Sequence, residues 1–415
     1  MTTTRPFRSL AANARAVVVT EPLWALFGTS ALYYITLFMA DVGLSNVQIG
    51  LVISINLYFR CFLQFLAAPI TNKLGRKRAT FLFDVSAWVI PMFIWALSGN
   101  FWFFLIGYIL NSTTSIVNVS FWLLSTEDSP EEERPRVIAA LKLVNILAGF
   151  LVPIAGLFAA RYGELPTFRV LFLLGAAAML AQNLIRNALS TETGAGQQAR
   201  TEHADTTYFR GAIRSLRVVG AALHVPRIRG LIVLYVATFL AFQINVFQTI
   251  YTARTLHFSP FVIGLVPAVS AAATLAVFLF LMPRMAKRAS MGQLTFEASI
   301  IVCLGWGLFL FIRDGDIPLL LVATTLFGVG TFCLESYRDA LVISAVPDKD
   351  RADLFAAVQT ITSILAIPSG LIAAVIFDAN PLALFLVITA LYALGLIIAS
   401  GHNIRNQTGV ATPTP

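Results

Sequence analysis

A group of three ionisable residues lies in an otherwise apolar segment of the C-terminal part of the chain. Glu335, Arg338 and Asp339 fall within residues 318–344, and their spacing places them on one face of a helix. Ionisable side chains in apolar segments are costly and often form proton relays. Glu335 and Asp339 are therefore predicted to bind a proton, with Arg338 tuning them. An internal ion pair that fixes the helix in place is the alternative.

One arginine occupies the middle of a second apolar segment. Within residues 46–71, Arg60 lies 14 residues from the start and 11 from the end, too deep for its side chain to reach water easily. We expect it to face a cavity, where it binds an anionic group of a substrate or a carboxylate such as Glu335. A structural ion pair is the alternative. Asp84 and Glu297 lie nearer the ends of their segments and are expected to pair with cations of the loops.

Uncharged polar side chains follow helical spacing in three further segments. The longest stripe lies on one face of a helix within residues 101–124 and consists of Asn111, Ser115, Asn118 and Trp122. Amides, hydroxyls and aromatic rings of this kind suit a polar, hydroxylated or amphipathic ligand. Hydrogen bonds between helices are the alternative. Together with Arg60, the predicted substrate-binding residues are Tyr33, Asn111, Asn118, Trp122, Asn245 and Gln248.

The chain lacks the sequence signatures of catalysis. No Walker loop, nucleophile elbow or histidine-rich metal spacing occurs, so no enzyme, cofactor or metal site is expected. Each of its three cysteines lies inside an apolar run, which argues against a disulfide framework. The net charge of +8 is accompanied by neither zinc spacing nor an aromatic and basic surface, so nucleic acid is not an expected partner.

Composition indicates the class of protein. Of 415 residues, 58% are hydrophobic and 12% are charged, which leaves too few polar residues to cover a soluble globule. The chain is therefore predicted to be an all-α integral membrane protein. Because a spanning helix needs about 20 mostly apolar residues, twelve segments qualify. They are residues 20–40, 46–71, 79–98, 101–124, 137–160, 168–187, 229–252, 260–282, 293–312, 318–344, 354–377 and 382–400.

The distribution of lysine and arginine predicts the orientation of these helices. With the N-terminus in the cytoplasm, 22 of the 29 Lys and Arg residues fall on the cytoplasmic side and four on the other. The positive-inside rule then places both termini in the cytoplasm. The basic N-terminus leads into a long apolar run without a small-residue cleavage site, so it is expected to remain as the first helix. The predicted location is a bacterial cytoplasmic membrane.

Two stretches of the chain recur at a nearly constant offset. "LSNVQIGLV" from Leu44 recurs as "FSPFVIGLV" from Phe258, and "PEEERPRVIAA" from Pro130 recurs as "PDKDRADLFAA" from Pro347. Offsets of 214 and 217 indicate two six-helix halves in parallel orientation, as in many alternating-access transporters. The predicted domains are the halves 1–187 and 229–400, a cytoplasmic linker 188–228 and a cytoplasmic tail 401–415.

The linker contains an amphipathic stretch. Residues 206–225 carry apolar side chains at helical spacing and arginines on another face. This pattern predicts a helix that lies on the inner leaflet, with its arginines towards anionic headgroups. A helix packed on the cytoplasmic surface of the protein itself is the alternative.

Twelve helices in two parallel repeats resemble the major facilitator superfamily, and one loop extends the resemblance. The family's loop between the second and third helices reads Gly-x-x-x-Asp-Arg/Lys-x-Gly-x-Arg/Lys-Arg/Lys. Here the stretch from Ala68 to Arg78 falls on it, in the corresponding loop. Plain positive-inside charge is the alternative. The resemblance implies a cytoplasmic gate that includes Asn72, Lys73, Gly75, Arg76, Lys77 and Arg78.

Two departures from the family pattern concern this gate. Ala68 replaces the first glycine and Asn72 replaces the aspartate. In the family, that aspartate meets the N-terminal end of the eleventh helix and locks the outward-facing state. Asn72 can still bond helix N–H groups, but it lacks the charge that a helix dipole favours. Glu127 and Arg134 resemble the Glu-x6-Arg element of sugar porters, which forms salt bridges with the loop, although chance spacing in an acidic segment is the alternative.

The resemblance implies a secondary active transporter whose first, fourth, seventh and tenth helices line a cavity. The stretch "AGFLVPIAG" from Ala148 is similar to the Gly/Pro-rich signature of drug/proton antiporters, which favours export. The predicted function is proton-coupled efflux of a drug or sugar-like molecule by a monomer, with protons, the small-molecule substrate and membrane lipid as partners. The alternatives are an uptake symporter, a lipid flippase, and a transport-dead receptor or scaffold.

Overall fold

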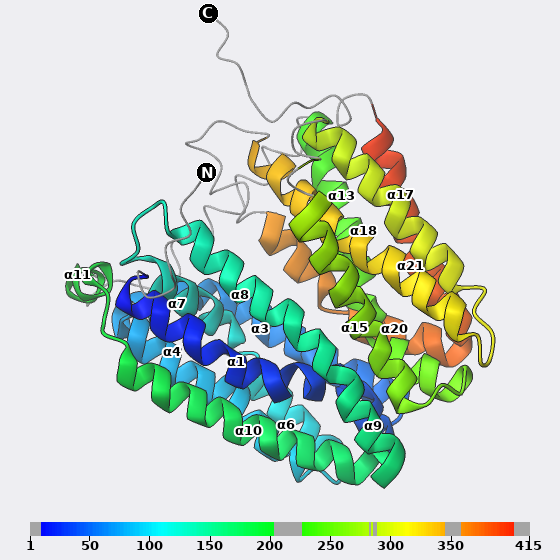
Figure 1. The fold of residues 1–415 in the computed structure, drawn as a ribbon, viewed down its shortest axis with the longest axis horizontal. Coiled ribbons are helices and arrows are strands. Elements are labelled where there is room, and N and C mark those ends of the chain that lie inside the picture. The colour runs from blue at the N-terminus through cyan, green and yellow to red at the C-terminus, as the bar shows by residue number, and fades with distance from the viewer. Residues whose placement is uncertain (1–9, 203–225, 282–283, 285–288, 345–357, 402–415) are drawn as a thin grey trace, which may run out of the picture. The chain divides into compact units, whose positions relative to one another are not determined.

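The computed structural model describes most of the chain, namely residues 10–202, 226–281, 284, 289–344 and 358–401. All regular elements within these residues are helices, as Figure 1 shows. The amphipathic helix predicted for residues 206–225 lies outside the described residues, as does nearly all of the predicted C-terminal tail.

Eleven helical segments among the described residues are long and apolar enough to cross a membrane. A twelfth results if the helix Val358–Ala366 and α20 (Ser369–Ala379), which meet at a bend of 42°, are counted as one span. Each of the twelve segments predicted from hydropathy overlaps one of these spans. The predicted all-α membrane fold is therefore confirmed.

The first six spans are followed by a short helix, α11 (Gly194–Glu202), that the hydropathy pattern does not predict. Helix α1 (Ala12–Tyr33) lies alongside α10 (Glu164–Leu189), as Figure 1 shows.

Several spans are composed of shorter helices joined end to end. The spans comprise α1 (Ala12–Tyr33) with α2 (Ile35–Asp41), α3 (Asn46–Leu74), α4 (Arg76–Asp84) with η2 (Val85–Val89) and α5 (Ile90–Ala96), α6 (Phe101–Asn111) with α7 (Thr114–Thr126), α8 (Arg134–Ala148) with η3 (Gly149–Leu151) and α9 (Val152–Tyr162), and α10 (Glu164–Leu189).

The later spans show the same composite construction. They comprise α13 (Pro226–Ile244) with η4 (Asn245–Phe247), α14 (Gln248–Ile250) and η5 (Tyr251–Thr255), α15 (Pro260–Ala276) with η6 (Val277–Leu281), α17 (Met291–Phe309), α18 (Ile317–Ser344), the bent pair that ends in α20, and α21 (Pro381–Ser400).

Contacts between residues divide the chain into two compact units. The first contains residues 1–44 and 55–210, and the second contains residues 45–54 and 211–415. The start of α3 therefore belongs to the second unit, although the rest of this helix belongs to the first. The domain bounds expected from the sequence stay a prediction.

Within the second unit, the start of α3 packs closely on α20. A Cβ atom added to Gly50 would lie 2.3 Å from the carbonyl oxygen of Gly370, so the two backbones approach with no room for a side chain. Leu371 N donates a hydrogen bond to Ser54 Oγ at 2.9 Å. Small residues at membrane helix contacts allow this kind of approach.

The turns that precede α3 and α15 repeat one another. Gly43 and His257, which are 214 residues apart, both have a positive φ, of 98° and 50°. Ser45 and Ser259 then cap the two helices, each accepting a hydrogen bond on Oγ from the backbone N–H three residues later, at 3.2 and 3.4 Å. The local structure thus follows the offset read from the sequence.

Aromatic side chains fill the interior of each unit. In the first, Phe38 of α2 stacks on Phe172 of α10, with ring centroids 5.3 Å apart. In the second, Trp306 of α17 stacks on Phe327 of α18 at 4.8 Å. Because lipid is as apolar as these rings, close packing holds membrane helices together more than hydrophobic burial does.

Candidate functional site

Four polar or charged side chains from three helices meet in the interior of the first unit. We call Glu21, Asp84, Gln182 and Arg186 the buried charge cluster, and their exposed fractions are 7%, 2%, 1% and 3%. Arg186 Nη2 forms an ion pair with Asp84 Oδ2 and donates to Asn183 Oδ1 at 2.6 Å. Gln182 Nε2 donates to Glu21 Oε2 at 3.1 Å. Each charge in the cluster thus has at least one polar contact.

Irregular helix geometry positions two members of this cluster. Asp84 is the last residue of α4, and a π-helical turn, η2, follows it directly. Such turns are rare and frequently occur at functional sites. Asn111 Nδ2 donates to Ala87 O within this turn at 2.8 Å and supports it from the side. Glu21 is followed by Pro22 inside α1, which removes one N–H group from that helix.

A cavity of about 140 Å³ lies beside the buried charge cluster. Trp24 and Trp88 form part of its wall, with ring centroids 4.7 Å apart and planes tilted by 50°. Asn118, one of the predicted substrate-binding residues, also lines it. The cavity therefore combines carboxylates, a guanidinium, amides and indole rings, which together can bind a charged or hydrogen-bonding group.

Sequence reasoning misses most of this cluster. It expects Asp84 to pair with a cation of a loop, and it singles out neither Glu21 nor Arg186. The structure instead places Arg186 inside α10, where it pairs with Asp84 of α4. The available signal is the presence of two carboxylates within predicted spans, since each is costly in a membrane and calls for a partner.

The turn between α3 and α4 holds a second group, which we call the loop cluster: Asn72, Arg76, Glu127, Glu192 and Thr193. Arg76 is 6% exposed. Its Nη2 lies 3.0 Å from Glu127 Oε1, and its Nη1 donates to Asn72 Oδ1 at 2.8 Å. Thr193 Oγ1 donates to Glu127 Oε2 at 2.6 Å. The structure thus brings together Asn72, Arg76 and Glu127, three of the predicted gate residues.

Glu192 is a member of the loop cluster that the sequence pattern does not predict. Its carboxylate accepts hydrogen bonds from Arg76 N at 2.7 Å and Lys77 N at 3.2 Å, which are free N–H groups at the start of α4. Gly75, directly before them, has a φ of 87°, and a Cβ atom there would lie 2.3 Å from Glu192 Oε2. Both the backbone conformation and the contact with Glu192 therefore require glycine.

The other predicted gate residues lie around this cluster. Lys73 and Arg78 are exposed, and Lys77 is half-buried. Arg134 Nε donates to Ser129 O at 3.2 Å. Of the Glu-x6-Arg element, Glu127 pairs with Arg76 of the loop at 3.0 Å. The gate role of the element stays a prediction.

A third group surrounds Arg338 of α18, which is 4% exposed. Its Nε and Nη2 donate to Asp339 Oδ1 at 3.1 and 3.0 Å, and its Nη1 donates to Thr238 Oγ1 at 2.7 Å. The guanidinium carbon lies 3.9 Å from the centroid of the Tyr235 ring, within cation–π range. Glu335 is exposed, and 40% of the Asp339 side chain is exposed. The proton-binding role of these carboxylates stays a prediction.

Asn245 and Gln248 lie where the seventh span is interrupted. Asn245 begins the short 3-10 turn η4, and Gln248 begins α14, after which the π-helical turn η5 follows. Asn245 Nδ2 donates to Gln248 Oε1 at 2.8 Å. Asn245 Oδ1 and Gln248 Nε2 are buried, and neither has a hydrogen-bond partner within the described part of the chain. Interrupted helices with free polar groups are a common way to build a binding site in transporters.

The remaining predicted substrate-binding residues have different surroundings. Asn111 is 8% exposed and is engaged with the turn η2, a contact of the inter-helix kind given above as the alternative. Trp122 is 40% exposed, and Tyr33 packs its ring on that of Tyr34. Arg60 is half-buried, and its guanidinium makes no ion pair with any described residue.

The chain matches the family model described as Major Facilitator Superfamily over residues 23–370. It belongs to the Major Facilitator Superfamily. The resemblance stated from the signature loop is therefore confirmed. No curated protein matches the chain. The loop cluster includes Asn72 and Arg76 of the superfamily's signature loop, and α18 is the tenth span.

Solved structures of transporters have the same fold as this superfamily member. The nucleoside transporter NupG has a TM-score of 0.70 at 15% identity, over 93% of this chain and 97% of its own. A POT family transporter in complex with 5-aminolevulinic acid has a TM-score of 0.69 at 12% identity, over 93% and 94%. A bacterial homolog of the human lysosomal transporter Spinster, in an inward-facing and occupied conformation, has a TM-score of 0.62 at 15% identity, over 96% of each.

Membership of the superfamily identifies the chain as a membrane transport protein, in a family of transporters rather than enzymes. Within the described residues, no group of three or more His, Cys, Asp or Glu side chains is arranged to hold a metal ion. The sites that remain for transport chemistry are the buried charge cluster, the loop cluster, the Arg338 group and the amide pair of the seventh span.

Proposed function

We propose that this superfamily member is a secondary active transporter that exports a small drug-like or sugar-like molecule in exchange for protons. The two six-helix halves rock around a site at the membrane midplane and expose it to each side in turn. In this proposal the protein acts as a monomer in a bacterial cytoplasmic membrane, surrounded by lipid, with both termini in the cytoplasm.

The observation that carries proton coupling is the ion pair in α18. A buried arginine is costly unless a counter-charge accompanies it, and Asp339 supplies that charge to Arg338 at 3.0 Å. Protonation of Asp339 removes the counter-charge and leaves Arg338 free to take another partner. Glu335 lies one turn away on the same face and is exposed. In this proposal it exchanges protons with water at the central transport site.

The substrate class follows from the uncharged polar groups. Asn245 Oδ1 and Gln248 Nε2 offer one acceptor and one donor to a ligand. Solved structures of the same fold are named as nucleoside and peptide transporters, which supports a polar organic substrate. Export is favoured by the Gly/Pro-rich stretch at η3, and uptake by proton symport is the alternative direction for the same residues.

The loop cluster is proposed to act as the cytoplasmic gate. Arg76 of α4 contacts Glu127 at the end of α7 and Asn72 of α3, so a movement of α4 relative to α7 breaks the ion pair with Glu127. Glu192 ties the start of α4 to the chain that follows α10. Lys73, Lys77, Arg78 and Arg134 supply further positive charge at the same end of the unit.

The test begins with a ligand. Thermal-shift screening of the purified protein against sugars, drugs, amino acids and nucleosides selects a molecule that stabilises it. Flux of that molecule is then measured in proteoliposomes under a pH gradient. Glu335→Gln should reduce gradient-driven flux by about tenfold or more while ligand binding persists, because the variant cannot carry the proton.

The matched control is Glu297→Gln in α17. This carboxylate also lies in a spanning helix, where it accepts a hydrogen bond from Gln293 Nε2 at 2.9 Å. Its removal should leave gradient-driven flux unchanged. Full flux in Glu335→Gln would show that proton coupling runs through other residues.

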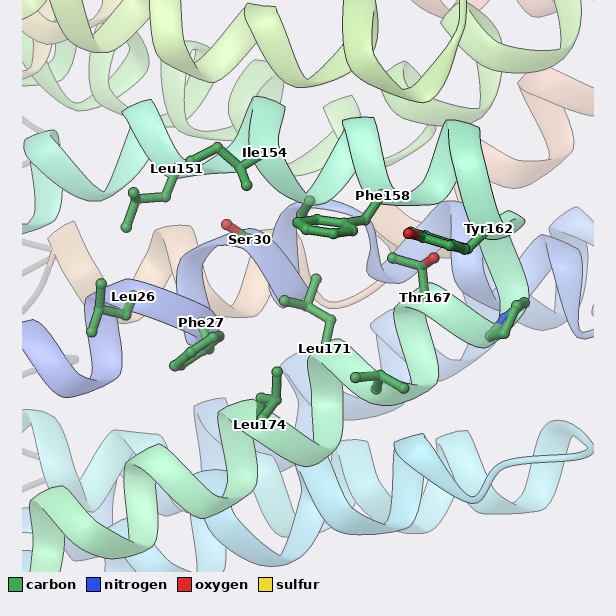
Figure 2. A pocket seen from close by; sticks show the side chains of 13 residues that line it. Leu26, Phe27, Ser30, Leu151, Ile154, Phe158, Tyr162, Thr167, Leu171 and Leu174 are labelled. Atoms are coloured by element: carbon green, nitrogen blue, oxygen red, sulfur yellow. The ribbon is translucent and has the colours of Figure 1, made fainter.

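A large apolar cavity supports lipid transport as a second candidate. The cavity measures about 470 Å³ and lies between α1, α9 and α10, with side chains of all three helices directed towards it (Figure 2). Most of its lining is aliphatic or aromatic, and an acyl chain fits such surroundings. A labelled lipid that binds and is not displaced by soluble competitors favours this candidate. The side chains labelled in Figure 2 are Leu26, Phe27, Ser30, Leu151, Ile154, Phe158, Tyr162, Thr167, Leu171 and Leu174.

A further inference from the structure

The buried charge cluster contains one more acidic than basic side chain. Glu21 and Asp84 are acidic, whereas Arg186 is the one basic residue that lines the cavity of about 140 Å³. Arg186 is already engaged by Asp84 and Asn183, so it does not neutralise Glu21 by a direct contact. On the neighbouring helix α8, the polar group that interacts with Glu21 is the amide of Asn145, which is uncharged. Glu21 is therefore the acidic side chain of the cluster that has no basic partner in direct contact.

A hydrogen-bond acceptor without a partner among the described residues lies beside the Glu21 carboxylate. Gln182 is 1% exposed and lines the cavity, and its Oε1 has no hydrogen-bond partner among the described residues. Its Nε2 already donates to Glu21 Oε2. A buried acceptor without a partner costs free energy, which a ligand that brings an N–H donor recovers. Glu21 and Gln182 Oε1 thus both offer hydrogen-bond acceptors to a ligand in the cavity.

The aromatic wall adds a third feature that favours a cation. Trp24 and Trp88 line the same cavity with their rings 4.7 Å apart. The face of an indole ring attracts ammonium groups, and the attraction increases when water is excluded. A volume of about 140 Å³ corresponds to roughly five water molecules, enough for an amino group and the small part of a molecule that carries it.

We propose that this cavity binds the protonated amino group of the transported molecule, with the Glu21 carboxylate as its counter-ion. The ammonium donates to Glu21 and to Gln182 Oε1, while Trp24 and Trp88 enclose its carbon substituent. In this proposal a proton neutralises Glu21 while the cavity is empty, because a buried carboxylate without a basic partner is costly in its charged form. Arrival of the ammonium releases that proton to water, so that one positive charge replaces another and the cluster keeps its net charge. Coupled to the proposed export of the substrate, this exchange assigns the substrate to the class of organic amines.

The test uses the complete purified chain in lipid nanodiscs, with benzylammonium chloride as the probe. Isothermal titration calorimetry in two buffers of different ionisation enthalpy, near neutral pH, measures affinity and proton release together. We expect saturable binding and the release of about one proton per probe bound. Sodium benzoate, which has the same ring and the opposite charge, should not bind at this site.

Variants locate the binding in the cavity. Glu21→Gln should weaken benzylammonium binding by roughly 30-fold or more and abolish proton release, since it removes the counter-ion. Trp24→Phe keeps an apolar ring in place and should weaken binding by roughly threefold, so it provides a second test if Glu21→Gln does not fold. Glu297→Gln, a carboxylate of another spanning helix, should bind the probe as the wild type does.

Each contrary result overturns the inference. Absence of benzylammonium binding to the wild type removes the amine site, and binding of benzoate instead makes the cluster an anion site centred on Arg186. Unchanged affinity in folded Glu21→Gln and Trp24→Phe places the probe elsewhere. Because these measurements involve no flux and no pH gradient, their failure is separate from that of the proposed proton coupling through α18.

Discussion

At the scale of single residues, the ion pair between Asp84 and Arg186 is buried inside the first unit. Both side chains are about 97% buried, so neither can exchange its partner for water. A buried pair adds little net stability compared with apolar residues, but the loss of one partner leaves an uncompensated charge. A substitution of only one of the two residues should therefore destabilise the protein more than a substitution of both.

This asymmetry gives a prediction for stability. Asp84→Asn should lower the free energy of unfolding by about 3 kcal/mol, because Arg186 stays charged without its partner. The double variant Asp84→Asn with Arg186→Gln should recover most of that loss. Thermal unfolding in detergent micelles measures both. Equal stability of Asp84→Asn and the wild type would show that the pair is not buried as described.

Asn72 gives a second prediction at this scale. Its Oδ1 accepts a hydrogen bond from Arg76 at 2.8 Å, and an aspartate there would add the charge found in the family pattern. Asn72→Asp should strengthen the gate and favour the outward-facing state. The readout is thiol labelling of Asn118→Cys in a chain without Cys61, Cys303 and Cys333, which should increase from the periplasmic side.

The control for this prediction is Asn100→Asp, at the cap of α6, where Asn100 Oδ1 accepts from Trp102 N at 3.0 Å. It introduces the same charge away from the loop cluster and should leave labelling unchanged. If Asn72→Asp also leaves it unchanged, Asn72 marks topology only and has no role as a gate.

At the scale of helices, hydropathy predicts where the chain spans the membrane but not where spans are interrupted. A window of about 20 residues averages over turns of three to five residues, so η2, η4 and η5 leave no signal in it. These interruptions depend on contacts from other helices, such as the bond from Asn111 to Ala87 O. The same averaging explains why the sequence pattern does not single out Arg186. This residue lies near the end of α10, where its polar neighbours resemble those of a loop.

Contacts between helices give a further prediction. The backbones of α3 and α20 meet at Gly50, where a Cβ atom would lie 2.3 Å from Gly370 O. Gly50→Ala should therefore destabilise the protein by about 2 kcal/mol, since backbone atoms cannot move aside as a side chain does. Gly307→Ala in α17 is the matched control, because nothing lies within 4 Å of its added Cβ.

The control should be neutral or stabilising by up to about 1 kcal/mol, the helix propensity gained when alanine replaces glycine. Thermal unfolding of the two variants side by side gives the difference. If Gly50→Ala is as stable as Gly307→Ala, the close approach of α3 and α20 does not persist in the membrane.

At the scale of the whole molecule, the sequence is sufficient to predict the superfamily fold. The repeat offset of 214, the twelve apolar segments and the signature loop all indicate it, and the family match over residues 23–370 confirms it. The buried charge cluster cannot be predicted in this way. Glu21, Asp84 and Arg186 come from helices that are far apart in the sequence, and spacing within one helix carries no information about which helices pack together.

The central claim is that this transporter couples substrate movement to protons. It is tested most directly in wild-type proteoliposomes that contain a pH-sensitive dye, to which a ligand selected by thermal shift is added without any imposed gradient. The account predicts that ligand moving down its gradient drives protons in the opposite direction. Protons moving with the ligand would indicate the uptake symporter, and ligand flux with no change in pH would contradict the claim.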